Sequence, residues 1–507
     1  MLAKVNSSAV FGLEAIPIEV EVDIASQGLP SFTIVGLPDK AVEESKERVR
    51  SAIKNTGAEF PAKRITVNLA PADLPKEGPS YDLPIALGIL LASGQLTGTV
   101  NDAVFIGELS LDGRVRPVKG VLSHTMTAKK RGLSSVYVPS ENAKEAAIIP
   151  KISIYPVENL TTLLKHFSKL EVISPQKSTK LKEYITQEQY DLDMADIKGQ
   201  EKVKRAMEIA AAGGHNIILK GPPGAGKTLI ARTLPSILPK LTFQEVLEVT
   251  NLYSISGLLT TTVITNRPFR SPHHTTSSVG LIGGGTLPIP GEISLAHRGV
   301  LFLDEFPEFP RNVLEALRQP IEDGFVTISR SKGKITYPAK TMLVAALNPC
   351  PCGHLGSTKH QCICSSSQIS RYTKRISGPM LDRIDIHLDV PAVEVKKLVD
   401  QNMDSQKESS SVIRKRVQKA RDIQEKRFKN TSLITNADLS LRDVKKFCKL
   451  SPACLLLLEK ATEKMQLSAR SYNRMIKLAR TIADLENVPH IMPSHIAEAL
   501  QYRPRFV

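Results

Sequence analysis

The stretch GPPGAGKT at residues 221–228 constrains this chain most, because such a loop needs a strand before it and a helix after it. The apolar run NIILK at 216–220 predicts the strand, and LIARTLPSIL at 229–238 predicts the helix. Glycines let backbone N–H groups turn inward around phosphates at a helix N-terminus. We therefore predict that ATP is bound by Gly221, Pro222, Pro223, Gly224, Ala225, Gly226, Lys227 and Thr228.

Catalytic groups are predicted at the ends of two further strands. Lys227 is expected to reach the β and γ phosphates, and Thr228 to coordinate Mg²⁺. GVLFLDE at 299–305 is typical of a buried strand that ends in two carboxylates. Asp304 would hold Mg²⁺ through water, and Glu305 would polarise the attacking water. Asn348, which ends the strand-like MLVAALNP, is placed to orient that water.

The 507 residues are too many for one ordinary domain, and composition divides them into four parts. Residues 1–170 alternate strand and helix patterns, 171–193 form a polar linker, 194–400 carry the phosphate loop in a second α/β region, and 401–507 are predicted to be all helical. The longest apolar stretch, at 83–94, is too short to span a bilayer, and the N-terminus lacks the apolar core of a secretory signal. A cytoplasmic location without membrane association is expected.

The net charge of +16 is unevenly distributed. Residues 401–507 contain 21 Lys and Arg against 11 Asp and Glu, which leaves +10 in that region. An excess of this kind favours a polyanionic partner such as DNA, whereas a solvated basic helical surface is the alternative.

The phosphate loop, LFLDE, Asn348, LDRID at 381–385 and the helix around LSARSYNR, in this order, resemble an AAA+ ATPase. The resemblance implies that Asn348 is sensor 1 and that Arg383 is the finger reaching the γ-phosphate of a neighbouring subunit. It also implies that Arg470 is sensor 2, with Arg474 as the alternative. Such a finger implies a ring, for which the family expectation is a homo-hexamer. Structural ion pairs are the other interpretation of these arginines.

Residues 282–291, IGGGTLPIPG, and the sequence GFVTISRSKGKITYP at 324–338 resemble the helix-2-insert branch, which includes magnesium chelatase and the MCM helicases. The first segment is expected to be a loop facing a central pore. The second predicts a β-hairpin before the sensor strand. The resemblance implies DNA-backbone contacts by Lys332 at the hairpin tip, with Arg330 and Lys334 beside it, and an ordinary solvated turn is the alternative.

With RPFRSPHH at 267–274, CPCG at 350–353 and SGPMLDRID at 377–385, the whole chain resembles the YifB/ComM family of magnesium-chelatase-like bacterial ATPases. This resemblance implies a DNA helicase that promotes branch migration on single-stranded or branched DNA during natural transformation and homologous recombination. A magnesium-chelatase-like ATPase that remodels a protein partner is the second hypothesis. For His273 and His274 local hydrogen bonding is expected rather than metal binding.

Residues 76–87 and 107–132 resemble the proteolytic domain of Lon, which has the fold of ribosomal protein S5 domain 2. The resemblance places the nucleophile at Ser80, but the position of its lysine base holds Leu122. A serine without a base is a poor nucleophile, although Lys76 and Lys119 lie nearby in sequence. We therefore expect a role in assembly or nucleic-acid contact, with a Lon-like ATP-dependent protease as the third hypothesis.

Four of the six cysteines are grouped: Cys350, Cys352, Cys362 and Cys364. In a reducing compartment, two C-x-C pairs joined by a loop favour metal binding over disulfides. Four thiolates satisfy the tetrahedral preference of Zn²⁺, so a structural zinc site is predicted. His354 or His360 could replace one thiolate, and free thiols are the alternative.

Overall fold

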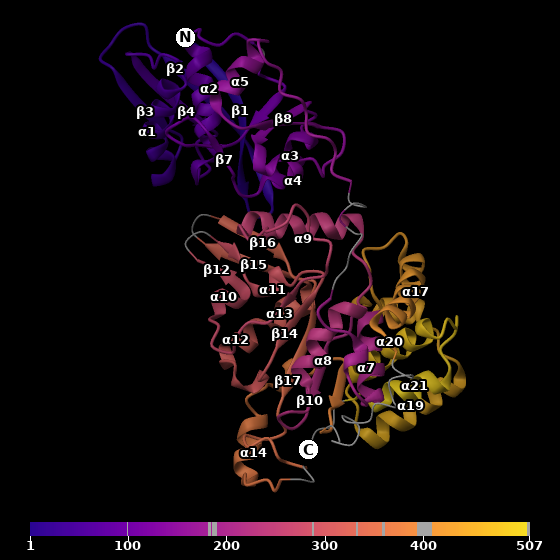
Figure 1. Cartoon of the computed structure of the whole chain (residues 1–507). Helices are drawn as coiled ribbons and strands as arrows, with labels where there is room; N and C mark the ends of the chain where they lie inside the picture. Colours follow the sequence, from indigo (N-terminus) through magenta and orange to yellow (C-terminus); the bar gives the residue numbers. More distant parts are fainter. Residues whose placement is uncertain are drawn as a thin grey trace. The chain divides into compact units, whose positions relative to one another are not determined.

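The computed structural model describes residues 1–98, 100–180, 184, 190–285, 288–330, 333–356, 360–392 and 408–503 (Figure 1). The chain forms two compact units that do not follow chain order. Unit 1 consists of Met1–Gln187, Val246–Ile264 and Thr327–Thr336. Unit 2 consists of Glu188–Glu245, Thr265–Val326 and Tyr337–Val507. Among the described helices, none combines the length and the apolar character that a bilayer crossing requires.

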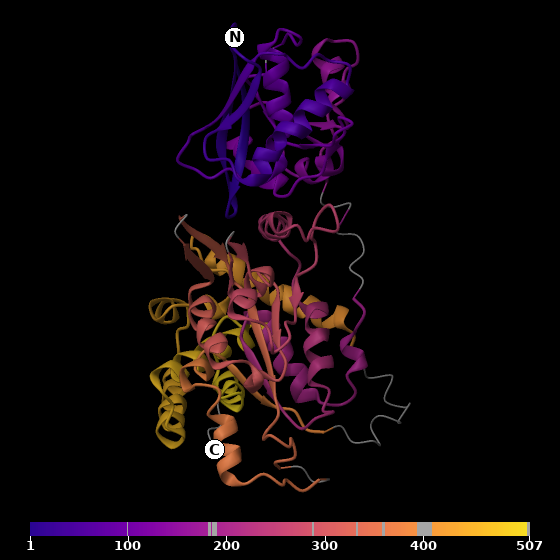
Figure 2. The same ribbon diagram turned by 90° about the vertical axis from the view of Figure 1, so that its left-hand side faces the viewer.

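Unit 1 is built on two sheets covered by helices (Figure 2). The four-stranded sheet has the order β1 (Leu2–Phe11), β2 (Glu14–Ile24), β4 (Arg64–Ala70), β3 (Ser31–Val35). The three-stranded parallel sheet has the order β5 (Ala103–Phe105), β8 (Ser135–Pro139), β9 (Ser153–Val157). A small antiparallel pair consists of β6 (Glu108–Leu109) and β7 (Val115–Arg116). The helices are α1 (Lys40–Asn55), α2 (Asp82–Ala92), α3 (Val121–Lys130), α4 (Ala143–Ala146) and α5 (Leu160–Phe167).

Strand β2 shows the alternation expected of a strand with one buried face: Ile18, Val20 and Val22 are buried, and the residues between them are more exposed. Helix α2 is apolar all round, and it packs against β1 and β2. Its Gly88 allows the close approach, since a Cβ there would stand 2.4 Å from a methyl of Val22. The core of unit 1 therefore lies between this helix and the sheet.

Unit 2 is built on a five-stranded parallel sheet in the order β11 (Phe269–Arg270), β14 (Val300–Leu303), β17 (Met342–Leu347), β10 (Ile217–Lys220), β18 (Ile386–Asp389). The residues of β14 and β17 are all buried, as expected for strands covered on both faces. Helices before and between the strands are α7 (Glu201–Gly213), α8 (Lys227–Thr233), α10 (Ser278–Ile282), α11 (Glu292–Leu295), α12 (Arg311–Ala316), α13 (Arg318–Asp323), α14 (Ser366–Thr373) and α15 (Gly378–Leu381).

Antiparallel pairs occur in two segments, one predicted to be a loop and the other a hairpin. Residues 282–291, expected to be a loop, contain the antiparallel pair β12 (Gly283–Gly284) and β13 (Ile289–Pro290). The hairpin before the sensor strand is confirmed as β15 (Phe325–Arg330) and β16 (Gly333–Pro338). Helix α9 (Phe243–Ser256) begins among residues of unit 2 and continues in unit 1.

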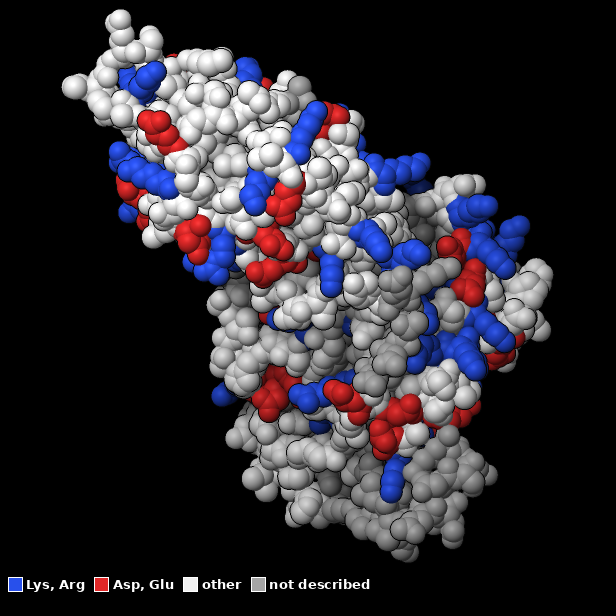
Figure 3. Space-filling model, turned by 45° about the horizontal axis from the view of Figure 1, so that its top comes forward, with Lys and Arg blue, Asp and Glu red and all other residues white. Residues whose placement is uncertain are grey.

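The described C-terminal residues, 408–503, are helical between their turns, as predicted. The helices are α17 (Ser410–Phe428), α18 (Leu441–Phe447), α19 (Pro452–Met465), α20 (Ala469–Leu485) and α21 (Pro493–Gln501). Both α17 and α20 pack against α7. Lys and Arg side chains gather along the right-hand edge of Figure 3, over the C-terminal helices that include α17, with some acidic side chains among them.

A buried carboxylate joins these helices. Asp484 on α20 pairs with Arg427 on α17 and with Arg480, at 2.5 Å and 2.9 Å, and accepts a hydrogen bond from Asn436 at 2.9 Å. Asp484 and Arg480 are almost completely buried. Because a buried charge is costly unless it is paired, each member of this cluster depends on the others.

We predict that Asp484→Ala lowers the free energy of unfolding by about 3–5 kcal/mol, because it leaves two arginines without their counter-ion. The matched control is Asp422→Ala on the exposed side of α17, expected to cost less than about 0.5 kcal/mol. Chemical denaturation measures both. Equal stabilities of the two variants would contradict the structural role of Asp484.

Candidate functional site

The phosphate loop occupies the predicted position between a strand and a helix. It follows β10 at the carboxyl end of the sheet, and α8 begins at Lys227. Gly224 and Gly226 have φ values of +74° and +83°, with nothing within 4 Å of an added Cβ. Glycine is required at these two positions by backbone conformation rather than by crowding. The loop can therefore direct N–H groups toward an anion at the start of α8.

The ammonium of Lys227 lies among oxygen atoms. Its Nζ donates to the carbonyls of Gly221 and Pro222 at 2.8 Å and 2.9 Å, and to Oδ1 of Asn348 at 3.1 Å. Burial lowers the pKa of Lys227, and the charge of Asp304 acts in the opposite direction. A bound phosphate would favour the charged ammonium in the same way. The contact with Asn348 also brings the loop together with the end of β17.

The predicted magnesium ligands lie side by side. Thr228 donates from Oγ1 to Oδ2 of Asp304 at 2.7 Å. Thr228 stands in the first turn of α8, and Asp304 directly follows β14. Hydroxyl and carboxylate oxygens are ligands that Mg²⁺ accepts beside phosphate oxygens and water. The donor set therefore fits a magnesium ion bound together with a nucleotide.

Glu305 follows Asp304 in a left-handed conformation, with φ +50°, and its side chain is more than half exposed. Its Oε2 lies 3.3 Å from Nδ1 of His274. His273 makes a local contact, since its Nδ1 lies 2.9 Å from Oγ1 of Thr275, whereas the contact of His274 reaches a residue distant in sequence. The strand order explains the difference, because β11 runs beside β14 and His274 follows β11 at the same edge.

Arg383, Arg470 and Arg474 lie at the other end of the strands. All three line a cavity of about 810 Å³ together with Asn216, Gly299 and Met342, which precede or begin β10, β14 and β17. The phosphate loop follows the opposite, carboxyl ends of these strands. The three predicted arginines are therefore gathered with one another and away from the phosphate loop of their own chain.

The three predicted arginines differ in how strongly they are bound by other groups of the chain. Arg383 donates to the carbonyls of Pro379 and Arg318 at 2.7 Å and 3.1 Å, and pairs with Glu322. Arg474 is mostly buried and lies 3.4 Å from Asp385, whereas Arg470, one turn earlier on α20, is exposed. Arg470 does not share the ion pair that engages Arg474.

The residues predicted to contact DNA belong to the β15–β16 hairpin. Lys332 lies outside the described residues, as does the side chain of Arg330. Lys334 is exposed on β16. Ile328 and Ile335 are buried on the two strands of the hairpin.

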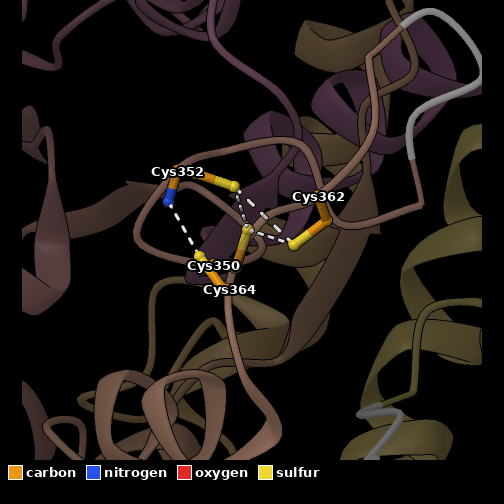
Figure 4. A group of neighbouring side chains, drawn as sticks. All are labelled: Cys350, Cys352, Cys362 and Cys364. Carbon is orange, nitrogen blue, oxygen red and sulfur yellow. Dashed lines mark hydrogen bonds between the residues drawn. The ribbon is translucent and has the colours of Figure 1, made fainter.

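The predicted zinc ligands converge from both ends of their loop (Figure 4). Sγ of Cys350 lies 3.4 Å from that of Cys352 and 3.6 Å from that of Cys362, and the latter two are 3.7 Å apart. All four sulfurs, including that of Cys364, lie within 4.8 Å of one another. Tetrahedral zinc with bonds of about 2.3 Å needs sulfurs about 3.8 Å apart, so the spacing fits.

Backbone N–H groups support these sulfurs. The amide of Cys352 donates to Sγ of Cys364 at 3.4 Å, and the amide of Leu355 donates to Sγ of Cys350 at 3.3 Å. Hydrogen bonds from the backbone of His354 and Ile363 lower the pKa of the Cys352 thiol to about 6, whereas burial and the neighbouring sulfurs raise the pKa of the Cys362 thiol against a backbone hydrogen bond from Cys364. Such donors stabilise thiolates, which are the form that binds metal. The rings of His354 and His360 pack on each other, 4.9 Å apart, and the described metal-ligand group contains only the cysteines.

Comparisons with known proteins cover both units. The family models described as magnesium chelatase subunit ChlI, subunit ChlI of Mg-chelatase, and magnesium chelatase subunit ChlI C-terminal match residues 193–398, 20–142 and 407–503. Competence protein ComM of Haemophilus influenzae is 45% identical over 506 residues, covering 99% of this chain and 97% of that protein. YifB of Salmonella typhimurium is 44% identical over 504 residues, with the same coverage.

The chain belongs to the YifB/ComM family of magnesium-chelatase-like AAA+ ATPases. The predicted fold class is confirmed: a Lon-like N-terminal region, a central AAA+ region and a helical C-terminal region. Lon protease of Brevibacillus choshinensis is 30% identical over 163 residues, which cover 29% of this chain and 20% of that protease. The four-part division of the chain at residues 170, 193 and 400 stays a prediction.

The Lon-like region of this family member does not assemble a serine–lysine pair in the described residues. Leu122 is fully buried, and its backbone N–H donates to Glu145. Lys76 donates to the carbonyl of Pro71, and Lys119 lies against Gly257, where an added Cβ would be 2.5 Å from its Cε. Among the described residues, no hydrogen bond joins either lysine to Ser80.

We predict that Ser80→Ala leaves ATP hydrolysis unchanged and does not reduce casein degradation. The reason is that, among the described residues, neither nearby lysine is hydrogen-bonded to Ser80 to take its proton. ATPase rates and casein digestion by the variant and the unmodified protein test this. Loss of casein digestion in the variant alone would establish Ser80 as a nucleophile.

Proposed function

We propose that this protein is a ring-forming, ATP-driven motor that acts on DNA as a helicase and promotes branch migration. The observation that carries the proposal is the placement of the phosphate loop and of the arginine cluster at opposite ends of one parallel sheet. A subunit with this arrangement supplies the phosphate-binding half of one nucleotide site and the arginine half of another. Repeated head-to-tail contacts of this kind close into a ring, for which we propose six subunits.

In the proposed site, each residue has a separate task. Lys227 holds the β and γ phosphates, and Thr228 and Asp304 hold Mg²⁺ directly or through water. The magnesium ion, when bound, neutralises charge that develops on the phosphate oxygens. Glu305 polarises the attacking water, and Asn348, 3.1 Å from Lys227, orients it.

The proposed trans residues are Arg383 and Arg470, with Arg474 as the alternative to Arg470. Arg383 acts as the finger, and the C-terminal arginine senses the γ-phosphate of the same neighbouring site. An arginine that stabilises charge on the transferred phosphate contributes a large factor in rate, of the order of 10³ or more. Hydrolysis therefore depends on assembly.

DNA as the substrate is supported by charge and by relatives. The chain has a net charge of +16, and its proposed DNA contacts, Arg330, Lys332 and Lys334, lie within five residues of one another in the sequence. Cations on a turn suit phosphate contacts without base reading. The relative ComM is named a competence protein, and uptake of DNA defines competence, so we propose action on single-stranded or branched DNA in natural transformation.

A protein-remodelling ATPase is the second candidate, because all three family models carry the name of a magnesium chelatase subunit. The net charge of +16 favours the DNA function over this candidate. We also propose that Zn²⁺ is bound by Cys350, Cys352, Cys362 and Cys364 as a structural ion. Metal analysis of purified protein tests this, and a zinc content near zero would contradict it.

The DNA hypothesis predicts that single-stranded or forked DNA stimulates ATP hydrolysis and that Lys332→Ala lowers the stimulation about tenfold, because a phosphate contact is lost. The matched control is Lys460→Ala, an exposed lysine on α19. The basal rate without DNA should be equal in all three proteins. Stimulation by a protein partner and not by DNA would favour the remodelling function instead.

The ring hypothesis predicts complementation between two inactive variants. Lys227→Ala and Arg383→Ala each lack hydrolysis, but mixing them in equal amounts regenerates a complete site at about a quarter of the interfaces of a randomly mixed ring. ATPase rates of the mixture and of each variant alone measure the effect. A mixture as inactive as its components would show that Arg383 does not act across subunits.

A further inference from the structure

The cysteine loop lies directly beside the phosphate loop. Its first ligand, Cys350, stands two residues after Asn348, whose side chain accepts the hydrogen bond from Lys227. Cys350 is fully buried, whereas the other three cysteines are partly exposed. The cysteine group is therefore attached to a residue of the nucleotide site through a very short stretch of buried backbone.

A second contact joins the two loops through Gly353. Gly353 lies between the ligands Cys352 and Cys362 and has a φ of +82°. A Cβ at this position would stand 2.6 Å from Cδ and 3.1 Å from Cγ of Pro223. The backbone of the cysteine loop thus packs on the proline ring of the phosphate loop itself. The N–H of Gly353 donates to the carbonyl of Cys350 at 2.9 Å, which fixes this turn relative to the buried cysteine.

The far end of the loop is also anchored. Cys364 is followed by Ser365, which caps α14 by accepting from the N–H of Gln368 while the Gln368 side chain accepts from the N–H of Ser365. The loop therefore runs between two ordered elements, β17 and α14. Its four sulfurs gather at one point, so a single ion would set the position of the turn that touches Pro223.

We propose that the zinc site is an allosteric support of the phosphate loop: the metal-closed turn holds Pro223 and Asn348 in the geometry that binds nucleotide, and metal loss weakens nucleotide binding. The proposal rests on the zinc occupancy proposed above. In addition to a structural role, it gives the zinc ion a thermodynamic coupling to the ATPase site.

Coupling between two binding sites is reciprocal. If zinc raises the affinity for nucleotide by some factor, then nucleotide raises the affinity for zinc by the same factor. For a direct packing contact between the two loops we expect a factor of about 5 or more, which is within the usual range for coupled sites. Measuring whether the two factors are equal tests the proposal without a measurement of catalysis.

The experiment uses the full-length protein carrying Glu305→Gln, so that nucleotide is bound but hydrolysed slowly. Zinc content is measured first, and then the Kd of a fluorescent ATP analogue is measured before and after removal of zinc by a chelator. The zinc Kd is measured by competition with a chromogenic chelator, with and without nucleotide. We expect nucleotide affinity to fall, and zinc affinity to rise with nucleotide, by the same factor of about 5 or more.

Two glycines of the loop provide a matched pair of variants. Gly353→Ala places a methyl group against Pro223, whereas Gly356→Ala, at a similar φ of +76°, meets nothing within 4 Å. Both substitutions carry the same backbone strain, so only the first tests the contact. We expect Gly353→Ala to keep its zinc and to weaken nucleotide binding about fivefold or more relative to Gly356→Ala.

The outcomes separate the two proposals. Absence of zinc from the purified protein overturns both. Zinc that is present but can be removed without changing nucleotide affinity overturns the coupling and leaves the structural ion in place. Equal nucleotide affinities of Gly353→Ala and Gly356→Ala would exclude Pro223 as the route.

Discussion

The parallel alignment of β14, β17 and β10 is the constraint on which the nucleotide site depends. In the register of these strands, Ala345 pairs on one side with Leu303 and on the other with Ile218. The loops that follow the three strands therefore begin at neighbouring points on one edge of the sheet, where open α/β sheets place their ligands. Hydrogen bonds from Lys227 and Thr228 then cross from one loop to the next.

The same alignment keeps the predicted arginines of a chain away from its own phosphate loop. Because all strands of this sheet point one way, groups at their amino ends cannot turn back to the phosphate loop. Arg383 and Arg474 lie there, and Arg383 is held by two backbone carbonyls and a carboxylate of its own chain. An arginine pre-positioned in this way costs little ordering entropy when a neighbouring phosphate arrives. The ATPase mechanism and the ring are thus parts of one hypothesis.

The parts of the fold and the site that could be predicted from the sequence are those encoded locally. The strand, loop and helix around Lys227 follow from apolar runs and glycines, and the β15–β16 hairpin follows from two strand-like runs around a turn. The contact of His274 with Glu305 could not be predicted in this way, because it depends on which strands are neighbours in the sheet. Predicting this contact would have required knowledge of the strand order, in which β11 lies beside β14.

Composition also gives no indication that α9 is shared between the two compact units. Part of α9 belongs with the N-terminal residues, and buried hydrogen bonds hold it there: Ser123 donates to Asn251 at 2.8 Å, and Ser254 lies against Glu145. Burial raises the pKa of Glu145, and the hydrogen bond from Ser254 opposes that shift. Isolated Ser, Asn and Glu residues have no periodicity, so pairs of this kind cannot be recognised before the fold is known.

The cysteine loop could be predicted in part from the sequence. Its ligands are evident from spacing, but the contact of Gly353 with Pro223 is not. A loop inserted between a sensor residue and the next helix carries an ordering cost, and metal binding can offset that cost because the binding free energy of zinc is available only to the ordered loop. Because the insertion begins two residues after Asn348, we expect metal binding that orders the loop also to order the nucleotide site.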